Sequence, residues 1–364
     1  MSQRARSRPE IFVDLGLEDH RLSGYDFTQQ WALLGTQWQP GRYLYKTFNA
    51  TQWQMQAAGQ AARWQKLQVL QRAATLYIRL LQKNQEWSLL KKQHQLLRLH
   101  FNLVHALWQT GSKTELDVLQ TRAEILKYQV ELNRTAWYKK MLSRELALFL
   151  GLAVSDSLQL MYLNTPKICA QPVPVLSDTL LDNNPWIRSL RLSADAQKWQ
   201  ARAARAQRLP MFYLAGGYFA DHDPTGDGNY YLFRAGMQIP LFRWKATHFE
   251  EQTAYIKSKA LCDNAWDARR ELRIKAEKIL TRLQGLKRTL SLQEKRLSAL
   301  QKMLRMAKGN YQAGLITNLE YLNIRQQRTA AGIAKQTTEL NYVLALVNFY
   351  LLTNQTARLR AMVK

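Results

Sequence analysis

The chain has 364 residues, of which 46% are hydrophobic and 22% are charged, so it can bury a core and does not have a disordered composition. Lysine and arginine outnumber aspartate and glutamate by 52 to 27, a balance that often indicates a nucleic-acid or anionic-membrane partner. The two cysteines, Cys169 and Cys262, form neither a CxxC pair nor a disulfide framework. No apolar run reaches the roughly 18 residues that a transmembrane helix needs.

The first predicted element is a β-hairpin at residues 9–41. Every second position of its first strand is apolar, at Ile11, Val13, Leu15 and Leu17. This alternation predicts one apolar face, and the positions between them, from Phe12 to Glu18, are expected to form a polar face. A tilted strand of about ten residues can cross a bilayer, although a soluble sheet explains one such hairpin equally well.

A long helical hairpin is predicted for residues 42–151. From Tyr43 to Gln109 there is no proline, and the composition favours a helix that would be about 100 Å long. Gly111 suits the left-handed position that ends a helix. Thr114 and Asp117 have the three-residue spacing of a capping box that would open the next helix.

The elements of the second half follow a proline-containing linker at residues 152–184. We expect Asn184 and Pro185 to open the next helix. The turn of the second β-hairpin is predicted at 221–228, where glycine and aspartate are frequent. The predicted boundaries are a helix at 185–209, a β-hairpin at 210–242, a second long helical hairpin at 243–354 and a tail at 355–364.

An internal repeat relates the two halves. The segment 108–122 aligns without gaps with 311–325, and both contain an aromatic residue, a glycine, a threonine and an arginine at equal spacings. At nearly the same offset, 9–16 aligns with 210–217, so the chain is a tandem duplication. The first half lacks an equivalent of the helix at 185–209. Segment 1–8 is therefore expected to be a helix remnant, and because it has no signal peptide we expect a truncated start.

Two hairpins supply only four strands, which are too few to close a transmembrane barrel. If the strands cross a membrane, several protomers must share one barrel. Aromatic residues near the junctions between strands and helices fit the interfacial belt of such a barrel; they are Trp38, Tyr43, Tyr45, Phe242 and Trp244.

In this arrangement the chain resembles the TolC family of outer-membrane efflux channels. The resemblance rests on Asn184-Pro185, on Pro210 before a strand, on Ile239-Pro240-Leu241-Phe242 after one, and on Tyr311-Gln-Ala-Gly314-Leu followed by Glu320-Tyr-Leu322. It implies a mainly α fold with a small antiparallel β part, in which long helical hairpins form an α-barrel. Each protomer would add four β-strands to a trimeric transmembrane β-barrel in the outer membrane.

The resemblance also implies a function and partners. The homotrimer would be the passive exit duct of a tripartite efflux or type I secretion system, surrounded by outer-membrane lipid. A periplasmic adaptor protein and an inner-membrane pump would be its partners, and the duct would be gated at its periplasmic helical tip.

The same resemblance assigns roles to residues at the tip. Tyr311 and Asp117 would form the closing pair, and Glu320 would face the lumen. Where the family often has an arginine and a second acid, this chain has Ile316 and Asn323, which argues against a salt-bridged latch and strong cation selectivity. The implied aperture residues are Trp108, Asp117, Tyr311, Glu320 and Asn323, and the implied adaptor contacts are Gly111, Ser112, Gly314 and Leu315.

Two alternatives remain on sequence grounds, a basic coiled coil that binds nucleic acid and a soluble coiled-coil scaffold. The basic residues are spread along all the helices and do not form one patch, so we favour solvated helix faces over nucleic-acid binding. The six histidines include no HExxH motif, and no catalytic or phosphate-binding motif occurs. We therefore expect no enzyme activity, no metal site and no cofactor.

Overall fold

The computed structural model describes residues 10–22, 25–39, 43–153, 158, 160–161, 163–223, 226–240 and 244–363. The predicted remnant at 1–8 and Phe242 lie outside these ranges. The chain divides into two compact units, each built from two stretches of sequence. The first unit comprises Met1–Arg63 with Pro185–Arg269, and the second comprises Trp64–Asn184 with Arg270–Lys364.

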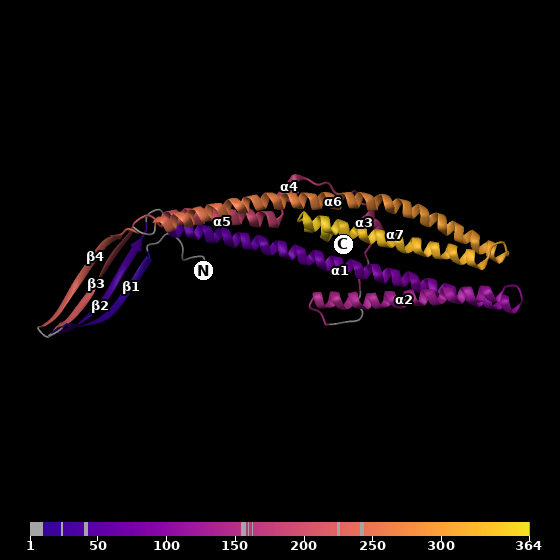
Figure 1. The fold of residues 1–364 in the computed structure, drawn as a ribbon, viewed down its shortest axis with the longest axis horizontal. Coiled ribbons are helices and arrows are strands. Elements are labelled where there is room, and N and C mark those ends of the chain that lie inside the picture. The colour runs from indigo at the N-terminus through magenta and orange to yellow at the C-terminus, as the bar shows by residue number, and fades with distance from the viewer. Residues whose placement is uncertain are drawn as a thin grey trace. The chain divides into compact units, whose positions relative to one another are not determined.

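One antiparallel sheet of four strands lies in the first unit, in the order β1-β2-β3-β4 (Figure 1). Each repeat supplies one hairpin, and the pairing of β2 with β3 joins the two. Most of the predicted turn at 221–228 is strand, because β3 extends through Asp223 and β4 begins at Gly226. The strands are β1 (Glu10–Leu22), β2 (Tyr25–Trp38), β3 (Met211–Asp223) and β4 (Gly226–Gln238).

The alternating pattern predicted an apolar face, and the structure leaves this face of the sheet exposed. Ile11 and Leu15 on β1 are 75% and 71% exposed. On β4, Tyr231 and Phe233 are 77% and 81% exposed. The register places these side chains on one face across all four strands. A surface of this kind is unfavourable in water unless something apolar covers it.

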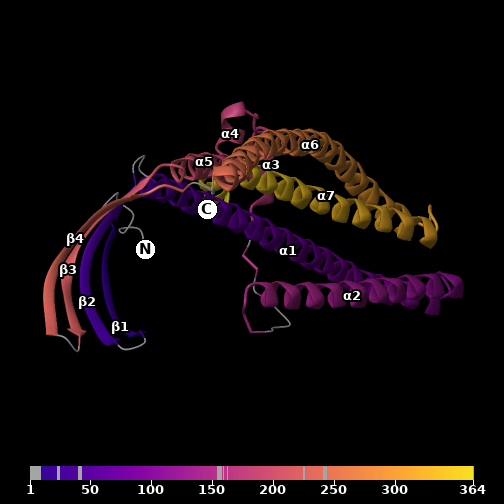
Figure 2. The same cartoon turned by 60° about the vertical axis from the view of Figure 1, so that its left-hand side comes forward.

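The opposite face is mixed: it carries the predicted polar residues Asp14 and Glu18, with Arg234 of β4, but it also carries a row of aromatic rings that the pattern did not predict. Trp31 stacks on Phe219 with a ring separation of 6.3 Å, and Phe219 stacks on Tyr230 at 5.3 Å. The register places a glycine directly opposite a large ring in Gly16–Trp31 and, elsewhere on the same face, in Gly35–Phe12 and Gly236–Tyr213. Each ring lies over its glycine and occupies the space where a side chain would otherwise stand. Figure 2 shows how strongly the four strands curve.

The helices repeat with the same period as the sequence. Helix α2 and helix α7 both have 35 residues, and their bounds differ by the offset of the duplication. The predicted tail is mostly helical in α8. Within the described residues, no helix is long and apolar enough to span a membrane. The helices are α1 (Tyr43–Gln109), α2 (Glu115–Phe149), α3 (Thr165–Ala170), α4 (Asp178–Asp182), α5 (Pro185–Ala206), α6 (Trp244–Gln312), α7 (Asn318–Leu352) and α8 (Thr356–Val363).

Side-chain hydrogen bonds hold the helices of the first unit beside the strand ends. Gln39 Nε2 donates to the Leu209 carbonyl oxygen at 2.9 Å, and Gln207 Nε2 donates to the Tyr43 hydroxyl at the same distance. Ser258 of α6 donates to the Ala194 carbonyl of α5 at 3.0 Å. Because α5 buries mostly small side chains, its neighbours can approach its backbone closely.

Helix α7 supplies much of the core of the second unit. Tyr342 and Phe349 are fully buried, as are Leu340, Val343 and Leu346 beside them. Each such side chain contributes about 1.5–3 kcal/mol relative to an exposed position. The side chain of Asn184, expected to open α5, donates to the Leu352 carbonyl at the end of α7 at 2.8 Å.

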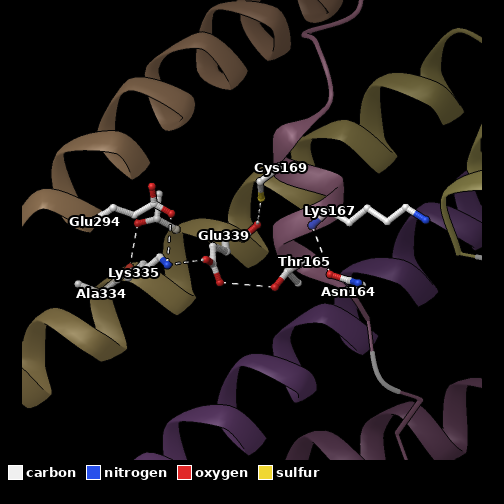
Figure 3. Close-up of polar contacts among 9 residues, drawn as sticks. Asn164, Thr165, Lys167, Cys169, Glu294, Ala334, Lys335 and Glu339 are labelled. Atoms are coloured by element: carbon white, nitrogen blue, oxygen red, sulfur yellow. Dashed lines mark hydrogen bonds and ion pairs between the residues drawn. The ribbon is translucent and has the colours of Figure 1, made fainter. Parts of the chain in front are cut away.

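The linker is fastened to α7 through one buried carboxylate (Figure 3). Glu339 Oε2 accepts a hydrogen bond from the Thr165 hydroxyl of α3 at 3.4 Å. Its other oxygen lies 3.4 Å from Lys335 Nζ, which also pairs with Glu294 of α6 at 3.3 Å. Burial and the nearby Glu339 raise the pKa of the Cys169 thiol to about 11, so this cysteine is not a reactive thiolate at neutral pH.

The contact between the two hairpins generates a first prediction. At Gly217 an added Cβ would overlap the Ala32 carbonyl oxygen and approach the Leu33 backbone. Gly217→Ala should therefore disturb the pairing of β2 with β3. The clash is with backbone atoms, so a change of side-chain rotamer cannot relieve it. Gly228→Ala is the matched control, because nothing lies within 4 Å of a Cβ there. We expect a lower midpoint of thermal unfolding in detergent for Gly217→Ala only; equal midpoints would contradict this register.

Candidate functional site at the helical tips

The two helical tips have the same backbone geometry. Gly111 and Gly314 have φ values of +75° and +77°, in the left-handed region that favours glycine. After each glycine the next amide donates back to the helix, from Ser112 to the Leu107 carbonyl at 2.8 Å and from Leu315 to the Asn310 carbonyl at 2.8 Å. The predicted stops are confirmed. Gly111, Ser112, Gly314 and Leu315 are all exposed at the tips.

A complete capping box opens the helix after each tip. The Asp117 amide donates to Thr114 Oγ1 at 3.3 Å, while the Thr114 amide donates to the Asp117 carboxylate at 3.1 Å. Thr317 and Glu320 repeat the exchange, at 3.2 Å and 2.8 Å. The hydrogen bonds from Thr317 hold the pKa of Glu320 below its ordinary value. Both acids predicted for the aperture are thus engaged in caps in this structure.

Tyr311 is buried between aromatic neighbours. It is 3% exposed, stacks on Tyr321 at 5.4 Å and lies 5.3 Å from the ring of His100. Lys113 Nζ lies 4.5 Å from the centre of its ring. Its hydroxyl has no hydrogen-bond partner among the described residues. Burial, the charge of Asp117 and the neighbouring Tyr321 raise the pKa of Tyr311 to about 12, so the phenol is neutral.

The closing pair remains a prediction. Asp117 acts electrostatically on Tyr311, but no hydrogen bond joins the two side chains in the described structure. Of the other aperture residues, Trp108 is 39% exposed and packs on His105, with ring centres 5.4 Å apart. Asn323 is exposed on α7.

A buried polar cluster at the tip escaped the sequence reasoning. Asn318, which is 1% exposed, donates through Nδ2 to the Asp117 carbonyl and to Thr121 Oγ1, both at 3.0 Å. Its Oδ1 therefore faces His100 Nε2 at 3.0 Å, and the imidazole must donate from that nitrogen. One amide thus joins α1, α2 and α7. In the alignment of the two repeats, Asn318 is equivalent to Glu115. This difference between the repeats was the sequence signal that could have indicated the cluster.

Comparison with known proteins finds a family model that matches part of this chain and a curated relative. A family model described as outer membrane efflux protein matches residues 176–355. The pyoverdine export outer membrane protein OpmQ of Pseudomonas putida is 25% identical over 258 residues, which are 68% of this chain and 54% of OpmQ. The chain therefore spans about half the length of this curated relative.

The fold agrees with this match. The crystal structure of CusC, described in connection with transmembrane channel formation, has a TM-score of 0.81 at 17% identity and covers 95% of this chain and 83% of CusC. The Campylobacter jejuni CmeC outer membrane channel has a TM-score of 0.78 at 15% identity, and the match covers 98% of this chain and 82% of CmeC. The chain is therefore similar to outer membrane efflux proteins, in sequence over residues 176–355 and in fold over most of its length.

The structural matches confirm the TolC-like fold expected from the repeat. The family match covers the second repeat, including its tip, and the structural matches extend over both repeats. The residue roles at the tips remain predictions.

The buried histidine gives a prediction of pH dependence. Burial lowers the pKa of His100; the bond to Asn318 opposes this shift, and the positive charge of Arg325 adds to it. Below the unfolded value of about 6.5, the unfolded chain binds a proton that the folded chain binds less readily. Stability should therefore decrease as the pH falls below that value and stay level above it.

The variant His100→Gln keeps a donor for Asn318 and removes the titration. Thermal midpoints measured between about pH 5 and 8 should fall less steeply at the acidic end for this variant than for the native chain. Parallel curves for the two proteins would show that His100 does not titrate differently on folding.

Proposed function

We propose that this chain is a protomer of an outer-membrane exit duct, the passive channel of a tripartite efflux or type I secretion system. The observation that carries the proposal is the four-stranded sheet, whose apolar face is exposed and whose outer strands, β1 and β4, each pair on one side only among the described residues. Lipid covers an apolar face of this kind. It cannot satisfy the open backbone groups of two edge strands.

The edges lead to the proposed assembly. An unpaired backbone group in hydrocarbon costs several kcal/mol, so β1 of one copy must pair with β4 of another until the ring closes. A homotrimer, the assembly implied by the family resemblance, would close such a ring. The helices would then continue from the shared barrel as a tube.

The tips supply the proposed contacts with partners. Leu315 is 74% exposed beside Gly314, and Leu116 and Leu319 stand at equivalent repeat positions with 62% and 52% exposed. Exposed leucines beside rigid turns are suited to receive an apolar partner surface. We assign Gly111, Ser112, Gly314 and Leu315 to contact with a periplasmic adaptor, which would join the duct to an inner-membrane pump. The family match and the fold favour this function over a nucleic-acid-binding coiled coil.

The proposed function is tested by assembly and conduction. The purified protein should migrate as a trimer on a gel when it is not heated and as a monomer when it is. It should also form ion-conducting pores in planar lipid bilayers. A monomer that conducts no current, together with salt-sensitive retention on DNA, would refute the duct and favour the alternative.

The proposed gate has its own test. If the Tyr311 hydroxyl binds the Asp117 carboxylate when the tip closes, both Tyr311→Phe and Asp117→Asn should increase the leak conductance of the closed trimer. Asp117→Asn also weakens the capping box, so Thr114→Ala serves as its control, because it removes the hydroxyl of the same box and keeps the Asp117 carboxylate. A leak that rises equally in Thr114→Ala would assign the effect to the cap and remove the pair from the gate.

A further inference from the structure

A groove in the second unit is lined by five cations, four of them on α6 and α7, and by leucines that are mostly on α1. It has a volume of about 730 Å³ and lies between α1, α6 and α7. This volume is in the range of small-molecule sites, which is about 300–1,000 Å³. Its cationic lining residues are Lys92 of α1, Arg305 and Lys308 of α6, and Arg325 and Arg328 of α7.

The parts of the three helices that line the groove contain no acidic residue. The sequence of α1 contains no aspartate or glutamate from Trp87 to its end, and that of α6 contains none from Lys295 to its end. Helix α7 has none from Tyr321 to Thr338. Within the part of the chain that the structure describes, no carboxylate forms an ion pair with any of the five cations.

The burial of Arg325 destabilises the protein when no anion occupies the groove. Its side chain is buried at 7% exposure, and its Nε donates to Gln93 Oε1 at 3.2 Å. Gln93 is itself 4% exposed and carries no charge. A buried guanidinium that has only neutral partners is destabilising unless an anion compensates it. Arg325 also lines the groove, so an anion in the groove would be within its reach.

The remaining wall of the groove is apolar. Leu96, Leu99 and Leu103 follow the three- and four-residue spacing of one helix face on α1, and they are 40%, 66% and 43% exposed. Leu304 of α6 joins them. Inorganic phosphate would leave these leucines in water, whereas a ligand with an apolar body would cover them.

We propose that this groove binds a small organic anion whose acidic group meets the cations of α6 and α7 and whose apolar body packs on the leucines of α1. The ligand class is an aromatic or aliphatic carboxylate, sulfonate or phosphate ester of drug-like size. The guanidinium of Arg325 holds the acidic group through charge-assisted hydrogen bonds.

Isothermal titration calorimetry of the full chain, purified in a neutral detergent, tests the site with 2-naphthoate. We expect saturable binding of 2-naphthoate, much weaker binding of inorganic phosphate, and none of the uncharged analogue 2-naphthalenemethanol. Equal binding of the uncharged analogue, or no binding of 2-naphthoate beyond that of detergent alone, would overturn the proposal. Binding is measured without conduction, so this result is separate from the test of the duct.

Variants locate the binding. Arg325→Gln, and the exposed pair Arg305→Gln with Lys308→Gln, should each weaken 2-naphthoate binding by about tenfold or more, since each removes charge-assisted contacts. The double variant of α6 alters the surface only, so it remains informative if Arg325→Gln fails to fold. Arg296→Gln with Lys302→Gln is the matched control, because these cations are on the same acid-free stretch of α6 but do not line the groove. An equal loss in the control would show diffuse attraction to a basic surface and refute a defined site.

The apolar wall is tested by Leu99→Ser. This change should weaken 2-naphthoate and leave the weak binding of phosphate unchanged. If both ligands weaken together, the leucines do not contact an apolar body and the proposed ligand class is wrong.

Discussion

The constraint on which this structure depends is the pairing of backbone groups at the edges of its sheet. Among the described residues, four strands with an exposed apolar face leave the outer edges of β1 and β4 without a neighbouring strand. In the proposed assembly other copies of the chain supply those partners, since lipid cannot. On the face opposite the exposed apolar one, rings lie over glycines, so large side chains pack close to the sheet. The proposed closure with other copies depends on this sheet.

The tips show how local rules and one nonlocal contact combine. Glycine stops and capping boxes fix each turn from residues only a few positions apart, which explains why both tips have the same geometry. The contact between hairpins is different in kind. A single buried amide, Asn318, satisfies groups from two other helices and holds the second repeat against the first. Any opening movement that separates these helices must break that set of bonds.

Much of the fold was predictable because its signals are local and occur twice. The alternation of apolar residues predicted the apolar face of β1, and the absence of proline predicted the long helices. The spacing of Thr114 from Asp117 predicted the capping box. The aromatic rings on the opposite face of the sheet were missed. A strand pattern shows which residues alternate, but not which ring covers which glycine on the neighbouring strand. The buried groups around His100 and Arg325 were missed for a similar reason: their partners lie on helices distant in sequence. The basic composition was interpreted as solvated helix faces, whereas the structure gathers five of the cations around one groove.

The seam between β2 and β3 joins strands that belong to different repeats. In an ancestor with a single repeat, the same pairing would have been a contact between separate polypeptides, and twice as many of them would have been needed to supply the same number of strands. Duplication within one chain thus makes this seam an intramolecular contact. Afterwards the two halves were free to diverge, so that one tip acquired Glu115 where the other acquired the buried Asn318.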